Sequence, residues 1–157
     1  MIKTKRIVSS LFFITTIAAC QSATALPSVT ADIDHEFTLA SGQSATITST
    51  DLTITFNSVL SDDRCPSEVE CAANGPVTVS LSVQQGNSSP TDFILQTFTD
   101  QNGSSPNVQF EGITSSAQVG DYLIRITSLT LYPKNLSPKI EPAEYRLGLV
   151  VSKTHSP

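Results

Sequence analysis

The amino-acid sequence predicts an all-β protein whose single domain is a β-sandwich of about eight antiparallel strands. Three segments alternate strictly between apolar and polar residues, which is typical of strands buried on one face: 52–57, 77–83 and 122–127. Turn residues rich in Gly and Asn separate the strands at 41–42, 85–87, 101–103 and 119–121. No stretch after the N-terminal region has a convincing helical period, and the regular spacing of strands favours a sandwich over a closed barrel.

The first 19 residues have the layout of a secretory signal peptide. Three basic residues lie in Met1–Arg6, and 7–19 is an uncharged, mostly apolar run, shorter than the roughly 20 residues that span a membrane. The run ends in Ile17-Ala18-Ala19-Cys20, which resembles a bacterial lipobox and predicts cleavage before Cys20 and acylation of its thiol. Ordinary cleavage after Ala25 is the alternative, because Ala23-Thr24-Ala25 is also a small-x-small site.

A lipidated Cys20 predicts an exported protein that a lipid holds on the membrane of the bacterial cell envelope. Gln21 rather than Asp follows, which favours the outer membrane by its similarity to enterobacterial sorting, whereas cleavage after Ala25 would give a secreted or periplasmic protein. Residues 20–34 are rich in Ser, Ala, Thr and Pro and are predicted to form a flexible tether. The β-sandwich domain is predicted over 35–153, with a tail over 154–157.

Weaker patterns predict five further strands, at 36–40, 43–48, 93–98, 107–111 and 145–152. Pro133, Pro138 and Pro142 lie between the last two predicted strands. Because proline cannot donate a ladder hydrogen bond, residues 132–144 are predicted to form an ordered, extended loop.

The fifteen residues 61–75 join the two best-formed strands and contain Cys65 and Cys71. Three cysteines in an exported protein become an even pair once Cys20 is lipidated or removed. Cys65 and Cys71 are therefore predicted to form a disulfide in the oxidising compartment. A loop this short gains only about 2 kcal/mol from chain entropy, so the disulfide is expected to act locally.

In this segment, Asp62-Asp63-Arg64-Cys65-Pro66 is followed by Cys71 and Gly75 and then by an alternating strand. The pattern resembles a group of small uncharacterised bacterial exported proteins and lipoproteins with the signature Asp-Ser-Arg-Cys-Pro…Cys-x-x-x-Gly. Asp63 stands where the signature has Ser, and Ala73 where an aromatic residue is usual, which implies a less covered loop. The resemblance implies a compact β domain and no particular activity. It extends over nearly the whole domain through 37–42, the strand ending in Phe56 and Val59, Tyr122-Leu-Ile-Arg-Ile…Leu-Tyr-Pro and Glu144-Tyr145-Arg146-Leu147.

The same segment is the candidate recognition loop, with charged and apolar side chains close together: Asp62, Asp63, Arg64, Glu68, Val69 and Glu70. Its four carboxylates could bind a cation such as Ca²⁺. Their spacing matches no EF-hand, however, and Arg64 opposes a cation. The preferred interpretation is that Arg64 pairs with a carboxylate while the others face solvent, with no metal or cofactor. Gly75 is attributed to a backbone requirement, and 100–103 to a turn rather than a calcium loop.

Charge and residue inventory argue against nucleic-acid binding and catalysis. Without the three basic residues of Met1–Arg6, six Lys and Arg oppose fourteen Asp and Glu, a net charge of −8. This balance argues against a nucleic-acid partner. The only histidines, His35 and His155, lie near the ends of the domain, so no Ser-His-Asp, Cys-His or zinc site is predicted.

The leading hypothesis is a non-enzymatic envelope lipoprotein whose sandwich presents the disulfide loop, the hairpin tips and the proline-rich loop to a protein or a glycan. A second hypothesis is an inhibitor of an exported hydrolase, which inserts 64–71 into its target. An exposed Arg64 or Val69 would favour it, and a buried, ion-paired Arg64 would count against it. A third is a structural or assembly role, which an exposed edge strand would favour.

Overall fold

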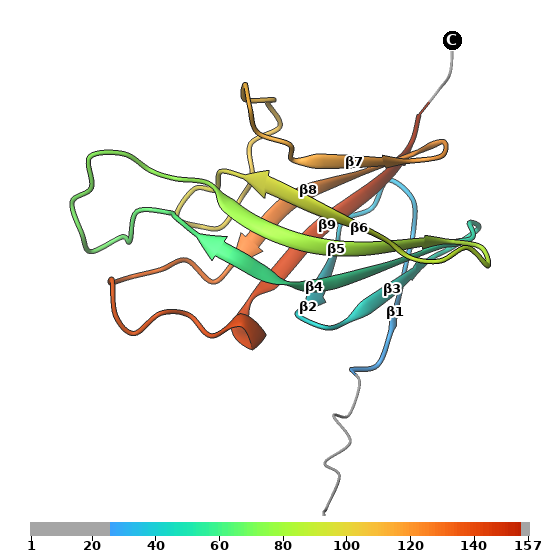
Figure 1. Ribbon diagram of the computed structural model, residues 1–157, viewed down its shortest axis with the longest axis horizontal. Coiled ribbons are helices and arrows are strands. Elements are labelled where there is room, and N and C mark those ends of the chain that lie inside the picture. Colours follow the sequence, from blue (N-terminus) through green and yellow to red (C-terminus); the bar gives the residue numbers. More distant parts are fainter. Residues whose placement is uncertain (1–25, 155–157) are drawn as a thin grey trace, which may run out of the picture.

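Two β-sheets stack face to face in the computed structural model, which describes residues 26–154 (Figure 1). The first sheet has five strands in the order β1 (Val29–Ala31), β3 (Ser44–Ile47), β4 (Leu52–Asp62), β5 (Val77–Gln85) and β6 (Thr91–Thr97). The second has four in the order β2 (Phe37–Ala40), β9 (Arg146–Lys153), β8 (Tyr122–Thr130) and β7 (Ser116–Val119). Neighbouring strands are antiparallel except β1 and β3, so the predicted all-β sandwich is confirmed.

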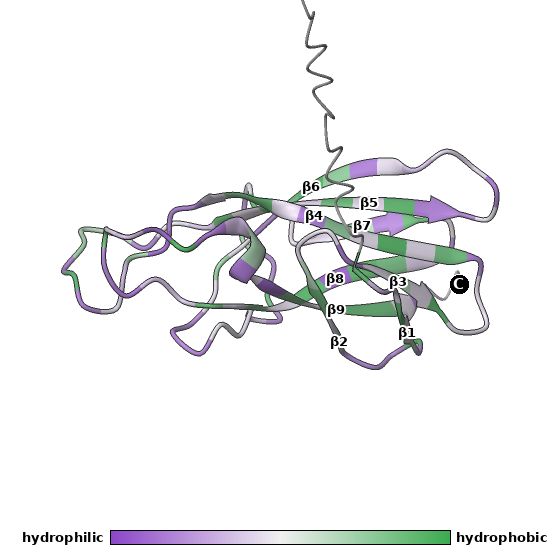
Figure 2. Ribbon diagram, turned by 90° about the horizontal axis from the view of Figure 1, so that it is seen from below, coloured by the Kyte–Doolittle hydropathy of each residue, from purple (hydrophilic) through white to green (hydrophobic). Residues whose placement is uncertain are grey.

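The alternating segments bury their apolar residues between the sheets. Along β4 and β5 every second residue is buried at first, and the polar residues between them face outward. Bands of hydrophobic and hydrophilic residues along the strands are visible in Figure 2. Phe56 is the largest fully buried side chain. The predicted turns also form, since Gly42 (φ 78°) and Gly86 (φ 56°) adopt the left-handed backbone that glycine allows.

The strand predicted over 107–111 is wrong. These residues lie in the long connection between β6 and β7, and their two apolar side chains, Val108 and Phe110, are exposed. Phe110 instead packs edge-to-face on Phe98, with ring centroids 5.0 Å apart. The segment alternates, but within residues 26–154 no strand pairs with it. The short β7, by contrast, was not predicted.

The flexible tether predicted over 20–34 also differs from the structure. Residues 29–31 form β1, which pairs in parallel with β3, and Ala31 is buried in the core. The backbone N–H of Thr48 donates to the Ala31 carbonyl (2.8 Å), and Gln43 Nε2 donates to the Pro27 carbonyl (2.9 Å). The apolar alternation of this segment is short and hidden by its Ser, Thr and Ala content. Cys20, the signal peptide and His155 lie outside the described residues.

Two connections project together from one end of the sandwich (Figure 1). One is the disulfide loop, residues 63–76 between β4 and β5, and the other is the proline loop, residues 131–145 between β8 and β9. The proline loop contains no strand, as predicted, and only one short 3-10 helix, η1 (Pro142–Glu144). We call this end of the molecule the loop end. The β5–β6 hairpin lies at the opposite end, so its tip and the two loops form no single surface.

Within residues 26–154, no helix has the length and apolar character needed to cross a membrane.

The β1 pairing gives a testable domain boundary. We predict that the free energy of unfolding is about 2 kcal/mol lower for a chain beginning at residue 35 than for one beginning at residue 26. The shorter chain loses the β1–β3 hydrogen bonds and the burial of Ala31. Urea denaturation followed by circular dichroism measures the difference. Equal stability of the two chains would show that β1 adds nothing to the domain.

Candidate functional site

Arg64 is buried at the loop end, and its side chain has no solvent exposure. It follows the end of β4, so its guanidinium reaches back to the carboxylate of Asp62, the last residue of that strand. Arg64 Nε lies 2.7 Å from Asp62 Oδ1, and Arg64 Nη2 lies 2.6 Å from Asp62 Oδ2. This two-point geometry confirms the predicted pairing of Arg64 with a carboxylate. It also matches the fork of the guanidinium to the two oxygens of the acid.

The remaining guanidinium N–H groups are bonded to elements of both sheets. Nη1 donates to Thr99 Oγ1 (3.0 Å), just beyond β6, and to the carbonyl of Leu129 in β8 (3.3 Å). Nη2 also donates to the carbonyl of Leu131 (2.8 Å), and the centroid of the Tyr132 ring lies 4.8 Å from the guanidinium carbon. A guanidinium has five donors, and all five are used. The buried cation therefore ties the ends of the two sheets together.

Asp62 is held ionised at neutral pH. Burial alone would raise the pKa of Asp62, but the hydrogen bonds and charge of Arg64 and the hydroxyl of Tyr145 (2.9 Å) outweigh it and hold the pKa below its usual 3.8. Burial, and then the hydrogen bond to Asp62, raise the pKa of Tyr145 well above its usual value. Neither group changes its protonation state near pH 7.

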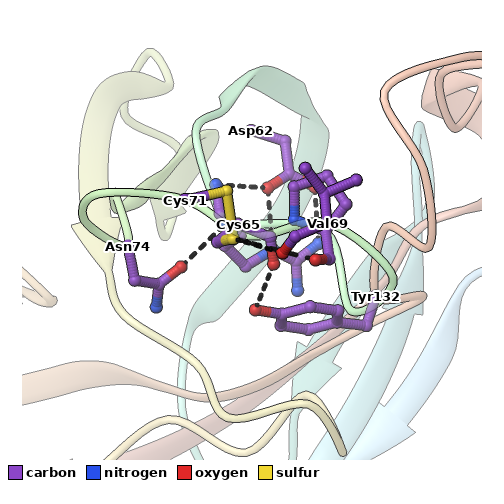
Figure 3. The surroundings of a disulfide bond; sticks show 8 residues. Asp62, Cys65, Val69, Cys71, Asn74 and Tyr132 are labelled. Atoms are coloured by element: carbon purple, nitrogen blue, oxygen red, sulfur yellow. Dashed lines mark hydrogen bonds and ion pairs between the residues drawn. A yellow bond between two sulfur atoms is a disulfide. The ribbon is translucent and has the colours of Figure 1, made fainter.

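A disulfide and two hydrogen bonds of Cys65 fix the base of the disulfide loop next to this ion pair. Cys65 and Cys71 form the predicted disulfide, with their Cα atoms 5.9 Å apart. The backbone N–H of Cys65 donates to Asn74 Oδ1 (2.8 Å), and its carbonyl accepts from the hydroxyl of Tyr132 (2.9 Å), as Figure 3 shows. A Cβ atom on Gly75 would lie 2.4 Å from the Asp63 carbonyl oxygen, so the backbone requirement predicted for this glycine is confirmed.

The disulfide loop and the proline loop are joined by backbone hydrogen bonds. The N–H groups of Ser67 and Glu68 donate to the carbonyls of Pro133 and Lys134, each at 3.0 Å. Asn135 Nδ2 adds a bond to Glu68 Oε2 (3.1 Å). Proline carbonyls remain good acceptors although proline has no N–H. The two loops therefore form one connected surface.

A groove of about 500 Å³ opens between the proline loop on one side and the end of β4 with the disulfide loop on the other. The ion pair of Asp62 and Arg64 lies at its base with Tyr145, and Leu60 and Leu136 lie at its rim. These two leucines are 53% and 70% exposed, respectively, so apolar side chains face solvent in a groove that the neutralised ion pair also lines.

The predicted recognition residues separate into three groups. Asp62 and Arg64 are structural, Val69 is half-buried, and the exposed members are Asp63, Glu68 and Glu70. Arg64 is buried and ion-paired, which counts against the inhibitor hypothesis. Among residues 26–154 no group of three potential ligands could hold a metal ion. The 100–103 segment forms the predicted turn, in which Asp100 Oδ1 accepts from the N–H groups of Asn102 and Ser104.

Sequence reasoning missed the partners of Arg64 and Asp62 that lie far along the chain. Thr99 accepts a hydrogen bond from Arg64, 35 residues away, and Tyr145 donates one to Asp62, 83 residues away. The ring of Tyr132 lies beside the guanidinium of Arg64. The distance of these partners along the chain leaves no local pattern that would pair them with Arg64 or Asp62.

Replacing Arg64 tests the ion pair. We predict that Arg64→Met lowers the free energy of unfolding by about 3 kcal/mol, because Asp62, Thr99 and two carbonyls lose their donor in a buried site. Arg125→Met on the outer face of β8 is the matched control and should change stability by less than about 0.5 kcal/mol. Equal losses in the two variants, measured by urea denaturation, would contradict the assigned role of Arg64.

The lowered pKa of Asp62 predicts how stability depends on pH. A carboxyl group whose folded pKa lies below its unfolded pKa stabilises the fold above the unfolded value and loses this contribution as pH falls through the folded pKa. The stability difference between wild type and Asp62→Asn should be constant from about pH 8 to pH 5 and shrink below about pH 4. A difference that persists unchanged to strongly acidic pH would show that the ionised form of Asp62 is not what stabilises the fold.

Comparisons with known proteins identify no relative. No protein-family model matches this chain, and no curated protein or solved structure is significantly similar to it. The geometry of the loop end is therefore the basis for a functional proposal.

Proposed function

We propose that this protein is a non-enzymatic lipoprotein of the bacterial cell envelope that binds a partner protein through its loop end. The observation that carries the proposal is the groove between the disulfide loop and the proline loop, with exposed leucines at its rim. The lipid anchor at Cys20 and placement on the outer membrane rest on the sequence pattern of the N-terminus.

Pre-organisation of the loop end supports a binding role. Three kinds of crosslink order the two loops before any partner arrives: the disulfide, the backbone bonds from Ser67 and Glu68, and the buried guanidinium of Arg64. A surface that is already ordered loses little conformational entropy on binding. The loop end therefore suits recognition better than a set of unconnected hairpin tips would.

The character of the rim favours a protein partner over a glycan. Leu60 and Leu136 expose branched apolar side chains on the two sides of the groove. A protein surface that covers such side chains stabilises the complex by about 25 cal/mol per Å² of apolar surface buried. Exposed apolar groups in a rimmed hollow are typical of protein interaction sites.

The chemistry of the groove base supports a non-enzymatic role. Proton transfer near pH 7 needs a group whose pKa lies close to that value. The pKa of Asp62 is lowered and that of Tyr145 is raised, and both side chains are bonded to each other or to Arg64. The ionisable groups at the base are thus committed to holding the fold.

A specific feature also favours the assembly hypothesis. β6 is an edge strand of its sheet, and Ile94 on it is 64% exposed. An edge strand of this kind can pair with another chain. The site of partner binding distinguishes the two functions.

Partner capture tests the proposal. We predict that the mature chain from residue 20, made with Cys20→Ser to avoid acylation, retains a specific protein from an envelope extract of the source bacterium. Leu136→Asp should reduce its capture at least tenfold, because a charge at the exposed rim opposes an apolar contact. The matched variant Ile94→Asp, on the β6 edge, should capture it as the wild type does.

The outcomes separate the hypotheses. Loss of capture only in Ile94→Asp would move the interaction to the β6 edge and support an assembly role. Equal capture by all three proteins, with circular dichroism showing that each is folded, would remove the loop end from consideration.

A further inference from the structure

One wall of the groove is a strand edge that has no neighbouring strand. β4 has eleven residues, but its register with β3 ends at the pair Ser44 and Thr55. The turn before β3 extends the contact by one residue, since Gly42 N–H donates to the Phe56 carbonyl (2.6 Å) and Phe56 N–H donates to the Gln43 carbonyl (3.0 Å). Within residues 26–154, no strand lies beside 58–62 on the side opposite β5.

The proline loop borders this edge without pairing with it. Pro133 and Pro142 line the groove, and neither has an N–H to donate to a ladder. The Pro133 carbonyl is used by Ser67 in the disulfide loop. Within residues 26–154, no backbone hydrogen bond joins the proline loop to 58–62. The register of β4 with β5 shifts between Phe56 and Ser58 and between Val59 and Ser61, so this unpaired edge is short and bulged.

The side chains around the edge provide separate apolar contacts. Val59 packs against the core, Leu60 is exposed, and Leu136 and Ile140 lie in the opposite wall. An extended peptide that pairs with a strand edge places alternate side chains on opposite sides. Backbone hydrogen bonds then give affinity, and the apolar hollow selects side chains.

Charged side chains on the rim favour a bound segment that carries a basic residue. The charge of Asp62 is neutralised by Arg64, but Asp63 at the groove and Glu68 and Glu70 in the same loop are exposed. The opposite rim carries Lys139. A basic residue in the bound segment would complement the acidic side of the groove.

We propose that the groove binds an extended peptide segment of the partner protein, which adds a short strand to the free edge of β4 at 58–62. The segment has apolar residues at alternate positions and a basic residue where it passes Asp63. This inference rests on the proposed function and specifies how its partner is recognised.

The test uses a phage-displayed library of random ten-residue linear peptides, selected on the mature chain with Cys20→Ser. Selected peptides should alternate apolar residues and carry Lys or Arg. Their affinity, measured by fluorescence anisotropy with synthetic copies, should fall at least tenfold for Leu60→Asp and for Leu136→Asp. It should not change for Ile94→Asp, and Asp63→Lys should weaken it.

Backbone methylation separates strand addition from side-chain contact alone. Methylating the nitrogens of every second peptide residue removes the donors on one edge of the strand, so one of the two registers should weaken binding at least tenfold and the other should not. Failure to select any peptide, equal binding to Leu136→Asp, or no effect of methylation in either register would overturn the proposal.

Other occupants of the groove give distinct results. Binding at least tenfold tighter to residues 26–157 than to the mature chain would make the protein's own segment 20–25 the occupant. A dimer that sedimentation detects in the wild type but not in Leu136→Asp would make a second copy the occupant. Either result overturns this inference.

The proposed function and this inference can fail separately. If Leu136→Asp loses the captured partner but the peptide tests fail, binding at the loop end stands and strand addition does not. If Leu136→Asp changes neither capture nor peptide binding, both are wrong.

Discussion

The buried ion pair between Arg64 and Asp62 is the interaction on which the loop end depends. A guanidinium removed from water is costly unless its donors and charge are all matched, and here a carboxylate, a hydroxyl and two backbone carbonyls match them. These acceptors come from three parts of the chain, around residues 62, 99 and 129–131, so the cation is satisfied only when both sheets are in place. The site therefore specifies how the sandwich closes at this end, although it sits in a loop rather than in the apolar core.

The loop end has a buried polar layer and an exposed apolar layer. The lower layer is polar, fully bonded and fixed in its protonation state, and it positions the disulfide loop through the carbonyl of Cys65 and the hydroxyl of Tyr132. The upper layer is apolar and exposed, with Leu60 and Leu136 on either side of a groove. The lower layer stabilises the shape and the upper layer offers the contact surface, which explains why the most charged stretch of the sequence contributes little free charge at the groove base.

The sequence was informative where the signal is local. Alternation located β4, β5 and β8, glycines located the turns, and cysteine pairing located the disulfide. It failed for 107–111, where alternation lacks a neighbouring strand, and for β1, whose pairing partner lies beyond a turn and another strand. The burial of Arg64 could not be predicted, because Leu129, Leu131 and Thr99 approach it only after both sheets have formed.

Hydrogen–deuterium exchange of the loop-end amides tests the central claim most directly, because it reports on loop order without requiring a known partner. The amides of Ser67 and Glu68, which bond to the proline loop, should be protected in the wild type and lose that protection in Arg64→Met. Amides in the middle of β5 and β8 should stay protected in both proteins under the same conditions. If Ser67 and Glu68 keep their protection in Arg64→Met, the buried ion pair does not order the loop end, and the account is contradicted.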